Sequence, residues 1–237
     1  FKSINDTLGH MVGDEVLRIV TDRITGSIRD GDTAARLGGD EFAVVVPQVR
    51  TREDVVDLAR RLHATNSAPA AVEGREIPLS VSVGFAVYPS DAEGVDQLMR
   101  HADLALYEAK RLGRDQVHAF RPQLAAAAVQ RSRIEEQLRR ALDENALELH
   151  YQPQVDLGTG RVRGVEALVR WPRNGATLSP EEFIPIAESS GAIRPLGRWV
   201  LREAARQQAL WRAQGYDVTM AVNVSPAEAS SEGFIPA

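Results

Sequence analysis

Residues 37–42 read LGGDEF, two glycines followed by two carboxylates, with short apolar runs at 33–37 and 41–46 on either side. Glycine adopts the positive φ that a tight turn requires, so the stretch predicts two antiparallel strands joined at Gly38 and Gly39. Glycine N–H groups can approach a phosphate closely, and an Asp beside them can hold a divalent cation. A plain hairpin turn with solvated carboxylates accounts for the stretch about equally well.

Periodic apolar residues predict the elements on both sides of this hairpin. Asp14 is expected to cap the helix before it, and Thr51 with Asp54 forms a capping-box pattern that opens the helix after it. Further along, the sequence predicts a strand at 77–87, a helix at 95–109 and a short strand at 117–120. Strands that alternate with helices favour an α/β fold with parallel strands.

The sequence changes character near Arg121, where a charged helix follows Pro122. This helix is the expected connector between two domains, although an ordinary surface helix of a single domain fits the pattern equally well. Beyond it, Ser179 followed by a proline and two glutamates is a strong helix start. The other elements expected in this half are strands at 147–151, 161–171 and 218–224 and a helix at 196–214.

The overall composition is that of a soluble globular protein, since 43% of the 237 residues are hydrophobic and 26% are charged, with a net charge of -5. The negative charge argues against a nucleic-acid binder that works through a bulk basic surface. The absence of cysteine excludes disulfides and thiolate metal sites and fits a reducing compartment. The chain starts at Phe1 without a Met or a signal pattern, so both ends are expected to be cuts within a longer protein.

Motifs around the hairpin carry a family resemblance. Residues 1–14 read FKSINDTLGHMVGD, and Arg36 lies directly before LGGDEF. Together these motifs resemble the GGDEF family of diguanylate cyclases, which condense two GTP molecules into cyclic di-GMP. The resemblance covers residue 1 to about residue 120 and implies a nucleotidyl-cyclase-like α/β sandwich. It also implies a homodimer, because each domain of this family holds one GTP and two of them must meet.

The resemblance implies that Asp40 ligates a metal, Mg²⁺ or Mn²⁺, and forms the catalytic pair with Glu41. The reaction would be a metal-assisted phosphoryl transfer, in which the 3′-hydroxyl of one GTP attacks the α-phosphate of the other. The family carries a further acidic metal ligand on a strand before the position of Phe1. The chain by itself is therefore expected to bind Mg²⁺ weakly and to make no product.

Substrate-binding roles follow from the same resemblance. Asn5 and Asp14 would recognise guanine, whose N1–H and N2–H₂ groups need acceptors and whose O6 accepts from an amide. Lys110 and Arg114 lie four residues apart at a helix end and resemble the family's triphosphate-binding pair, and Lys2 is a further candidate for binding phosphate. Cations that complement the C-terminus of a helix dipole are an equally good explanation of Lys110 and Arg114.

Arg29 and Asp32 form an Arg–x–x–Asp pair a short distance before Gly38. Such a pair is common by chance and usually marks a solvated turn. At this offset it resembles the product-inhibition motif of the GGDEF family, in which the arginine forks onto guanine or phosphate of cyclic di-GMP.

A second set of motifs reads GVEALVRW at 164–171, PEEFIPIAE at 180–188 and AVNVS at 221–225. A Glu within an apolar strand, such as Glu166, needs either a metal or a buried salt bridge. With Gln152 upstream, the motifs resemble the EAL family of cyclic di-GMP phosphodiesterases, which implies the N-terminal part of a modified TIM barrel. Carried over, Glu166 and Asn223 are metal ligands. Gln152 and Arg170 would contact cyclic di-GMP, which a metal-activated water hydrolyses to pGpG.

The two resemblances divide the chain into a GGDEF domain at 1–120, a helical connector at 121–145 and an EAL domain at 146–237, each domain being incomplete. The longer parent is expected to make and hydrolyse cyclic di-GMP in the cytoplasm, with GTP and cyclic di-GMP as partners and no nucleic acid. A membrane would be reached only through other parts of the parent. Two alternatives stay open: a catalytically silent nucleotide sensor or scaffold, and a phosphodiesterase regulated by GTP binding to the first domain.

Overall fold

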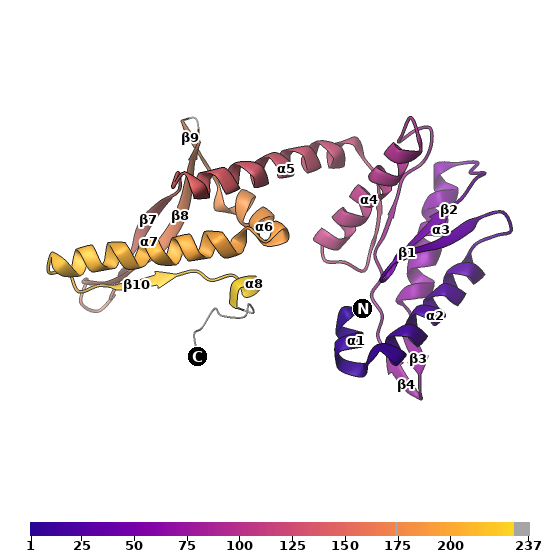
Figure 1. Cartoon of the computed structure of the whole chain (residues 1–237), viewed down its shortest axis with the longest axis horizontal. Helices are drawn as coiled ribbons and strands as arrows, with labels where there is room; N and C mark the ends of the chain where they lie inside the picture. Colours follow the sequence, from indigo (N-terminus) through magenta and orange to yellow (C-terminus); the bar gives the residue numbers. More distant parts are fainter. Residues whose placement is uncertain (174, 230–237) are drawn as a thin grey trace. The chain divides into compact units, whose positions relative to one another are not determined.

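The computed structural model describes residues 1–173 and 175–229. The chain divides into two compact units, Phe1–Ala128 and Val129–Ala237, and the division falls within helix α5 (Pro122–Asp143). Figure 1 shows the elements of each unit in sequence colours. Within the described ranges, none of the helices combines the length and apolar character that a bilayer-spanning segment needs.

The first unit contains helices, two antiparallel hairpins and a βαβ segment. Its elements are α1 (Lys2–Leu8), α2 (His10–Ser27), β1 (Thr33–Gly38), β2 (Glu41–Val45), α3 (Arg52–Ser67), β3 (Ala70–Val72), β4 (Arg75–Ile77), β5 (Val83–Phe85), α4 (Val95–Arg111) and β6 (Val117–Ala119). The predicted hairpin is confirmed, because β1 and β2 pair antiparallel with Gly38 opposite Glu41. The predicted capping box is also confirmed, with reciprocal hydrogen bonds between Thr51 and Asp54 at the start of α3.

Strands β5 and β6 pair in parallel and are connected by α4, as the alternation of strands and helices predicted. α4 lies directly on β5, because a Cβ added to Gly84 would come within 2.0 Å of the backbone nitrogen of Leu106. The missing side chain at Gly84 lets the two backbones approach, and Ala105 and Ala109 of α4 are fully buried. This packing fixes the end of α4 that carries Lys110.

A small core forms where α2 meets the β3–β4 hairpin. Its buried members are Val16, Ala70, Val72 and Ile77. Ile4 and Leu8 of α1 pack against the same core, so the short first helix is held on α2 by apolar contacts.

The prediction that Asp14 caps a helix is wrong. The helix α2 begins at His10, and Asp14 is an exposed residue in its second turn. The break between α1 and α2 falls instead at Gly9, whose φ of 87° only glycine adopts easily. The helix therefore starts one turn earlier than the apolar pattern indicates.

The continuous strand predicted at 77–87 is also wrong. Ile77 ends β4, and the chain enters a sheet again only at Val83, the first residue of β5. Pro78 accounts for the interruption, because proline has no N–H to donate to a neighbouring strand.

The second unit places helices over a mixed sheet. Its elements after α5 are β7 (Glu148–Val155), β8 (Val162–Arg173), β9 (Ala176–Leu178), α6 (Pro180–Ser190), α7 (Ile193–Ala213), β10 (Thr219–Val222) and α8 (Pro226–Ala229). The predicted start of α6 is confirmed, because the Ser179 side chain accepts from the N–H of Glu181. Gly191 ends the helix with a φ of 77°.

The sheet of this unit has the order β10–β8–β7, with β10 parallel and β7 antiparallel to β8. Val165, Ala167 and Trp171 of β8 are buried. Because side chains alternate along a strand, Glu166 and Arg170 lie on the opposite face of β8 from these three. The sheet thus separates an apolar face from the face that carries the predicted site residues.

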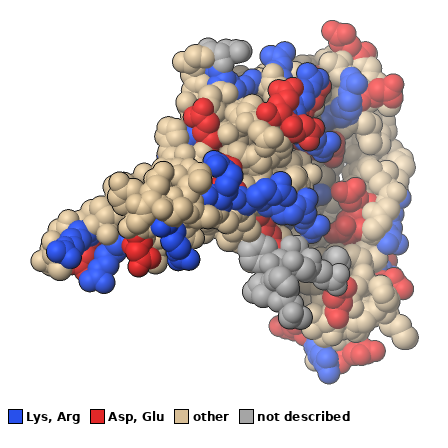
Figure 2. Space-filling view, turned by 60° about the vertical axis from the view of Figure 1, so that its left-hand side comes forward, with Lys and Arg blue, Asp and Glu red and all other residues tan. Residues whose placement is uncertain are grey.

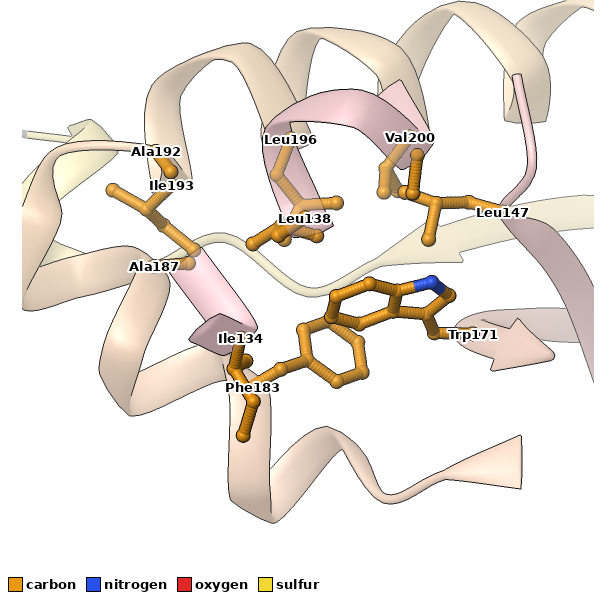
Figure 3. Packing of buried hydrophobic residues seen from close by; sticks show 11 residues of the cluster. Ile134, Leu138, Leu147, Trp171, Phe183, Ala187, Ala192, Ile193, Leu196 and Val200 are labelled. Carbon is orange, nitrogen blue, oxygen red and sulfur yellow. The ribbon is translucent and has the colours of Figure 1, made fainter. Parts of the chain in front are cut away.

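The apolar face packs against α5, α6 and α7, as Figure 3 shows from close by. The rings of Trp171 and Phe183 meet edge to face, with centroids 5.5 Å apart. Leu138 of α5 and Leu196 of α7 are almost fully buried in the same cluster. Burial of these apolar side chains stabilises the second unit.

Phe183→Ala is expected to lower the free energy of unfolding of the second unit by about 3–5 kcal/mol, because Phe183 is 0% exposed and its removal leaves a cavity beside Trp171. Urea unfolding followed by tryptophan fluorescence measures this effect in the intact chain, since all three tryptophans lie in the second unit. Leu157→Ala is the control, because Leu157 is 100% exposed. An equal loss in both variants would contradict the assignment of the core.

Charged side chains of both signs are interspersed on the face shown in Figure 2. Local ion pairs form along single helices, such as Arg18 with Glu15 at 2.6 Å and Arg139 with Glu135 at 2.7 Å. Exposed pairs of this kind each contribute about 0–1 kcal/mol, so the surface charges do little to decide the fold.

Candidate functional site

The hairpin tip presents the two carboxylates that the sequence singled out. Asp40 and Glu41 are both exposed, directly after Gly39, whose φ is 52°. Arg36 on β1 holds the turn, because its Nε and Nη2 donate to the Gly39 carbonyl at 2.9 and 2.7 Å. No role for Arg36 was predicted, although its place just before the glycines was the available signal in the sequence.

Lys110 lies beside the hairpin in the folded unit. Its Nζ is 3.2 Å from Oε1 of Glu41, so the last turn of α4 and the start of β2 meet. Arg114 follows the end of α4 with a φ of 63°, and its N–H donates to the carbonyl of Ala109 at 3.0 Å. The structure thus brings Lys110 to Glu41 of the predicted catalytic pair. Arg114, four residues further along the chain, is exposed.

Asn5 on α1 lies against Gly13 of α2. A Cβ added to Gly13 would be 1.8 Å from Oδ1 of Asn5, so the glycine makes room for the amide. Within the described part of the chain, this oxygen is buried and accepts no hydrogen bond. An unsatisfied buried acceptor is costly, and a ligand that brings a donor would relieve it.

Asp14 and Lys2 are the other two residues near the start of the chain that were predicted to contact the nucleotide. Asp14 follows Gly13 directly and is exposed at the same junction of α1 and α2. Lys2 belongs to α1, but its side chain lies outside what the structure describes.

Arg29 and Asp32 are joined in the structure. Oδ1 and Oδ2 of Asp32 accept from Nε and the backbone N–H of Arg29 at 3.3 and 3.1 Å, and Nη2 of Arg29 donates to the carbonyl of Gln48. The Asp32 side chain is only 3% exposed, whereas that of Arg29 is 56% exposed. The two residues therefore form an ordered turn and not a fully solvated one. The turn fixes the backbone of Arg29, from which its side chain extends.

The second cluster lies on the sheet of the other unit. Gln152 on β7 is directly opposite Glu166 on β8, and Ala221 on β10 is opposite Glu166 on the other side. Asn223 follows β10, and its Nδ2 donates to Oε1 of Glu166 at 2.7 Å. Three neighbouring strands thus bring together residues that are far apart in sequence.

Tyr151 shows which way β7 faces. Its ring packs edge to face on Trp211 of α7 with centroids 4.8 Å apart, and burial raises the pKa of its phenol. Gln152 must then point to the opposite face of the sheet, the face of Glu166.

A cavity of about 300 Å³ opens beside the ends of β8 and β10. Arg170 and Asn223 both line it, together with Glu188 of α6, for which no role was predicted. Arg170 donates from Nη1 to the carbonyl of Val169 at 2.9 Å. The other N–H groups of its guanidinium can donate to an anion.

Known families match the two halves of the chain. The diguanylate cyclase GGDEF domain matches residues 1–116, and the EAL domain matches residues 135–237. The chain belongs to the GGDEF–EAL proteins. Its α/β fold and its tandem organisation are those predicted from the motifs.

This GGDEF–EAL chain has similar proteins in Pseudomonas aeruginosa. It is 42% identical over 226 residues to the cyclic di-GMP phosphodiesterase NbdA and 40% identical over 238 residues to the bifunctional diguanylate cyclase/cyclic di-GMP phosphodiesterase MucR. These matches cover 94% and 99% of the chain but 29% and 34% of the relatives, so the chain spans about a third of their length. The GGDEF domain of YfiN (TpbB) superposes with a TM-score of 0.51 at 37% identity, over 53% of this chain and 73% of that one.

The GGDEF–EAL chain offers oxygen donors for a metal in both halves. These are the carboxylates of Asp40 and Glu41 in one half, and the carboxylate of Glu166 with the amide oxygen of Asn223 in the other. No group of three or more His, Cys, Asp or Glu side chains suited to a metal occurs among residues 1–173 and 175–229. Mg²⁺ is commonly held by one or two carboxylates, with waters and substrate oxygens completing the shell, so the donor chemistry fits.

Proposed function

We propose that the longer protein turns over cyclic di-GMP, condensing two GTP molecules in the GGDEF half and hydrolysing the product to pGpG in the EAL half. The observation that carries the proposal is the pair of polar clusters, Glu41 with Lys110 at 3.2 Å and Glu166 with Asn223 at 2.7 Å, each in the half that its family predicts. We assign residues 1–120 to the GGDEF domain, 121–145 to the connector and 146–237 to the EAL domain.

In the GGDEF half, Asn5 and Asp14 accept hydrogen bonds from the guanine N1–H and N2–H₂ groups. The orphaned Oδ1 of Asn5 supports this role, because guanine brings the missing donors. Lys110, Arg114 and Lys2 then hold the phosphates. Lys110 exchanges its exposed ion pair with Glu41 for a phosphate oxygen, which costs little.

Asp40 and Glu41 would hold Mg²⁺ or Mn²⁺, which when bound neutralises the charge that develops on the phosphates. Arg36 keeps the turn in shape through its two hydrogen bonds to Gly39. Glu41, freed from Lys110, would help deprotonate the attacking 3′-hydroxyl. Each GGDEF domain holds one GTP, so the reaction needs two copies of the protein face to face.

In the EAL half, Glu166 and Asn223 would hold the metal, which when bound lowers the pKa of a water and makes it a nucleophile. Gln152 lies opposite Glu166 on the same face and donates to, or accepts from, a guanine edge. Arg170, which lines the cavity, pairs through its guanidinium with a phosphate of cyclic di-GMP. GTP and cyclic di-GMP are intracellular nucleotides, so we place both halves in the cytoplasm.

A silent sensor and a GTP-regulated phosphodiesterase are the competing functions. Assays of the longer protein supplied separately with GTP and with cyclic di-GMP distinguish them from the proposal. Turnover of both nucleotides supports the proposal, hydrolysis that GTP stimulates without being consumed supports the regulated phosphodiesterase, and turnover of neither supports the sensor.

Arg29→Ala in the longer protein is expected to raise the cyclic di-GMP concentration that half-inhibits GTP condensation about 10- to 100-fold. The reason is that a hydrogen bond to a charged group contributes about 1.5–3 kcal/mol, and Arg29 projects from an ordered turn. Inhibition curves measure the effect. Arg50→Ala is the control, because Arg50 is an exposed arginine whose only described partner is Asp54 at 3.7 Å. Equal curves for the unsubstituted protein and the Arg29 variant would contradict an inhibitory site here.

A further inference from the structure

The loop that carries Asn223 depends on contacts with other parts of the second unit for its position. Asn223 follows the last residue of β10, Val222, and precedes α8, a helix of only four residues that starts at Pro226. A helix this short does not support itself, because the first turn costs more than it gains. Contacts from elsewhere in the unit must therefore fix the loop that aims Asn223 at Glu166.

Ser225 and Glu228 form a reciprocal capping box just after Asn223. The hydroxyl of Ser225 accepts from the N–H groups of Ala227 and Glu228 at 3.2 and 3.4 Å. In return, Oε2 of Glu228 accepts from the N–H of Ser225 at 3.2 Å. The box fixes the backbone two residues after Asn223.

Glu228 is also buried against α7. It is 6% exposed, and a Cβ added to Gly197 would lie 1.4 Å from its Oε1 and 2.4 Å from its Cδ. Only glycine at this position of α7 leaves room for the carboxylate. α7 itself is anchored in the core by Leu196 and Val200, on either side of the glycine.

We propose that Glu228, seated against Gly197 and bonded to Ser225, is a positioning residue that holds Asn223 toward Glu166. Glu228 does not touch substrate in this role. It transmits the rigid position of α7 to the loop after β10, so that the amide is in place before a cation arrives. The inference rests on the proposed function, because it takes Glu166 and Asn223 as metal ligands.

The test uses the 237-residue chain labelled with ¹⁵N and Mn²⁺ alone as the probe. Two readouts are followed: hydrogen exchange of the Ser225 backbone N–H, and the Mn²⁺ concentration that half-broadens the side-chain amide signal of Asn223. Glu228→Ala is expected to speed the exchange and to raise that Mn²⁺ concentration, each about 10-fold or more. Glu228→Gln keeps a carbonyl acceptor and should restore both values to within about threefold of the unsubstituted chain.

Gly197→Ala provides an independent variant, since it displaces the Glu228 side chain without removing it. It should reproduce the effects of Glu228→Ala, and its effect should vanish when Glu228 is already alanine. Fully additive effects, or a Glu228→Ala chain that matches the unsubstituted one in both readouts, would overturn the positioning role. If Glu228→Ala fails to fold by tryptophan fluorescence, Gly197→Ala against the unsubstituted chain decides the question by the same readouts.

Failure of the proposed metal site at Glu166 and Asn223 gives a different experimental result. Mn²⁺ that leaves Asn223 unbroadened in the unsubstituted chain would overturn the metal assignment. The exchange rates of Ser225 would in that case still support or overturn the role of Glu228. Glu182→Ala, an exposed glutamate of α6, is the control and should change neither readout.

Discussion

Glu166→Gln in the longer protein is expected to lower the rate of cyclic di-GMP hydrolysis at least about 100-fold. Changes to groups that only support a metal ligand already cost about 10- to 100-fold, so loss of a ligand's charge should reach or exceed the upper end. Glutamine keeps the size of the side chain and can still accept the hydrogen bond from Asn223, which in the structure is 2.7 Å long. The measurement is the rate of pGpG formation at saturating Mg²⁺.

The same variant should leave GTP condensation unchanged, because the GGDEF and EAL domains match separate parts of the chain. Glu182→Gln is the matched control, since Glu182 is an exposed glutamate of α6 that does not line the cavity. Hydrolysis that survives Glu166→Gln at more than about a tenth of the original rate would exclude Glu166 as a required ligand.

Glu41→Gln is expected to lower GTP condensation at least about 100-fold and to leave hydrolysis of cyclic di-GMP intact. Glu41 belongs to the carboxylate pair at the hairpin tip, and in the proposed mechanism its charge serves both the metal and the attacking hydroxyl. Stability should change little, because the ion pair that Glu41 makes with Lys110 is exposed. Radiolabelled GTP and separation of the products measure the rate.

A second exposed ion pair supplies the control for this variant. Asp22→Asn removes a carboxylate 3.2 Å from Arg18 on α2, which lies outside the proposed site. It should reproduce any general effect of losing an exposed pair. An equal fall in condensation for Asp22→Asn and Glu41→Gln would remove the catalytic role of Glu41.

Features with a local cause could be predicted from the sequence. The hairpin at Gly38 and Gly39, the box at Thr51 and the helix start at Ser179 each depend on residues within one turn, and the structure has all of them. The two wrong predictions were also local. Gly9 and Pro78 override the apolar periodicity around them. Gly9 adopts a positive φ that separates two helices, and Pro78 lacks the N–H that a strand needs for pairing.

The contacts between distant residues could not be predicted from the pattern alone. Lys110 and Glu41 are 69 positions apart, and their contact depends on where α4 lies, which Gly84 helps to set by letting α4 lie close to β5. The packing of Glu228 against Gly197 likewise depends on the position of α7 in the second unit. Its signals in the sequence are weak: a Ser-x-x-Glu spacing from Ser225 and a glycine inside an otherwise helical stretch.

The most direct test of the account is a time course with the longer protein, Mg²⁺ and GTP as the only nucleotide. Cyclic di-GMP should form first and pGpG should then accumulate, because pGpG can arise from GTP only if both halves act in turn. Glu166→Gln should stop the course at cyclic di-GMP, and Glu41→Gln should stop it at GTP. Unchanged GTP in the unsubstituted protein, together with no hydrolysis of added cyclic di-GMP, would contradict the proposal that this chain comes from an enzyme of cyclic di-GMP turnover.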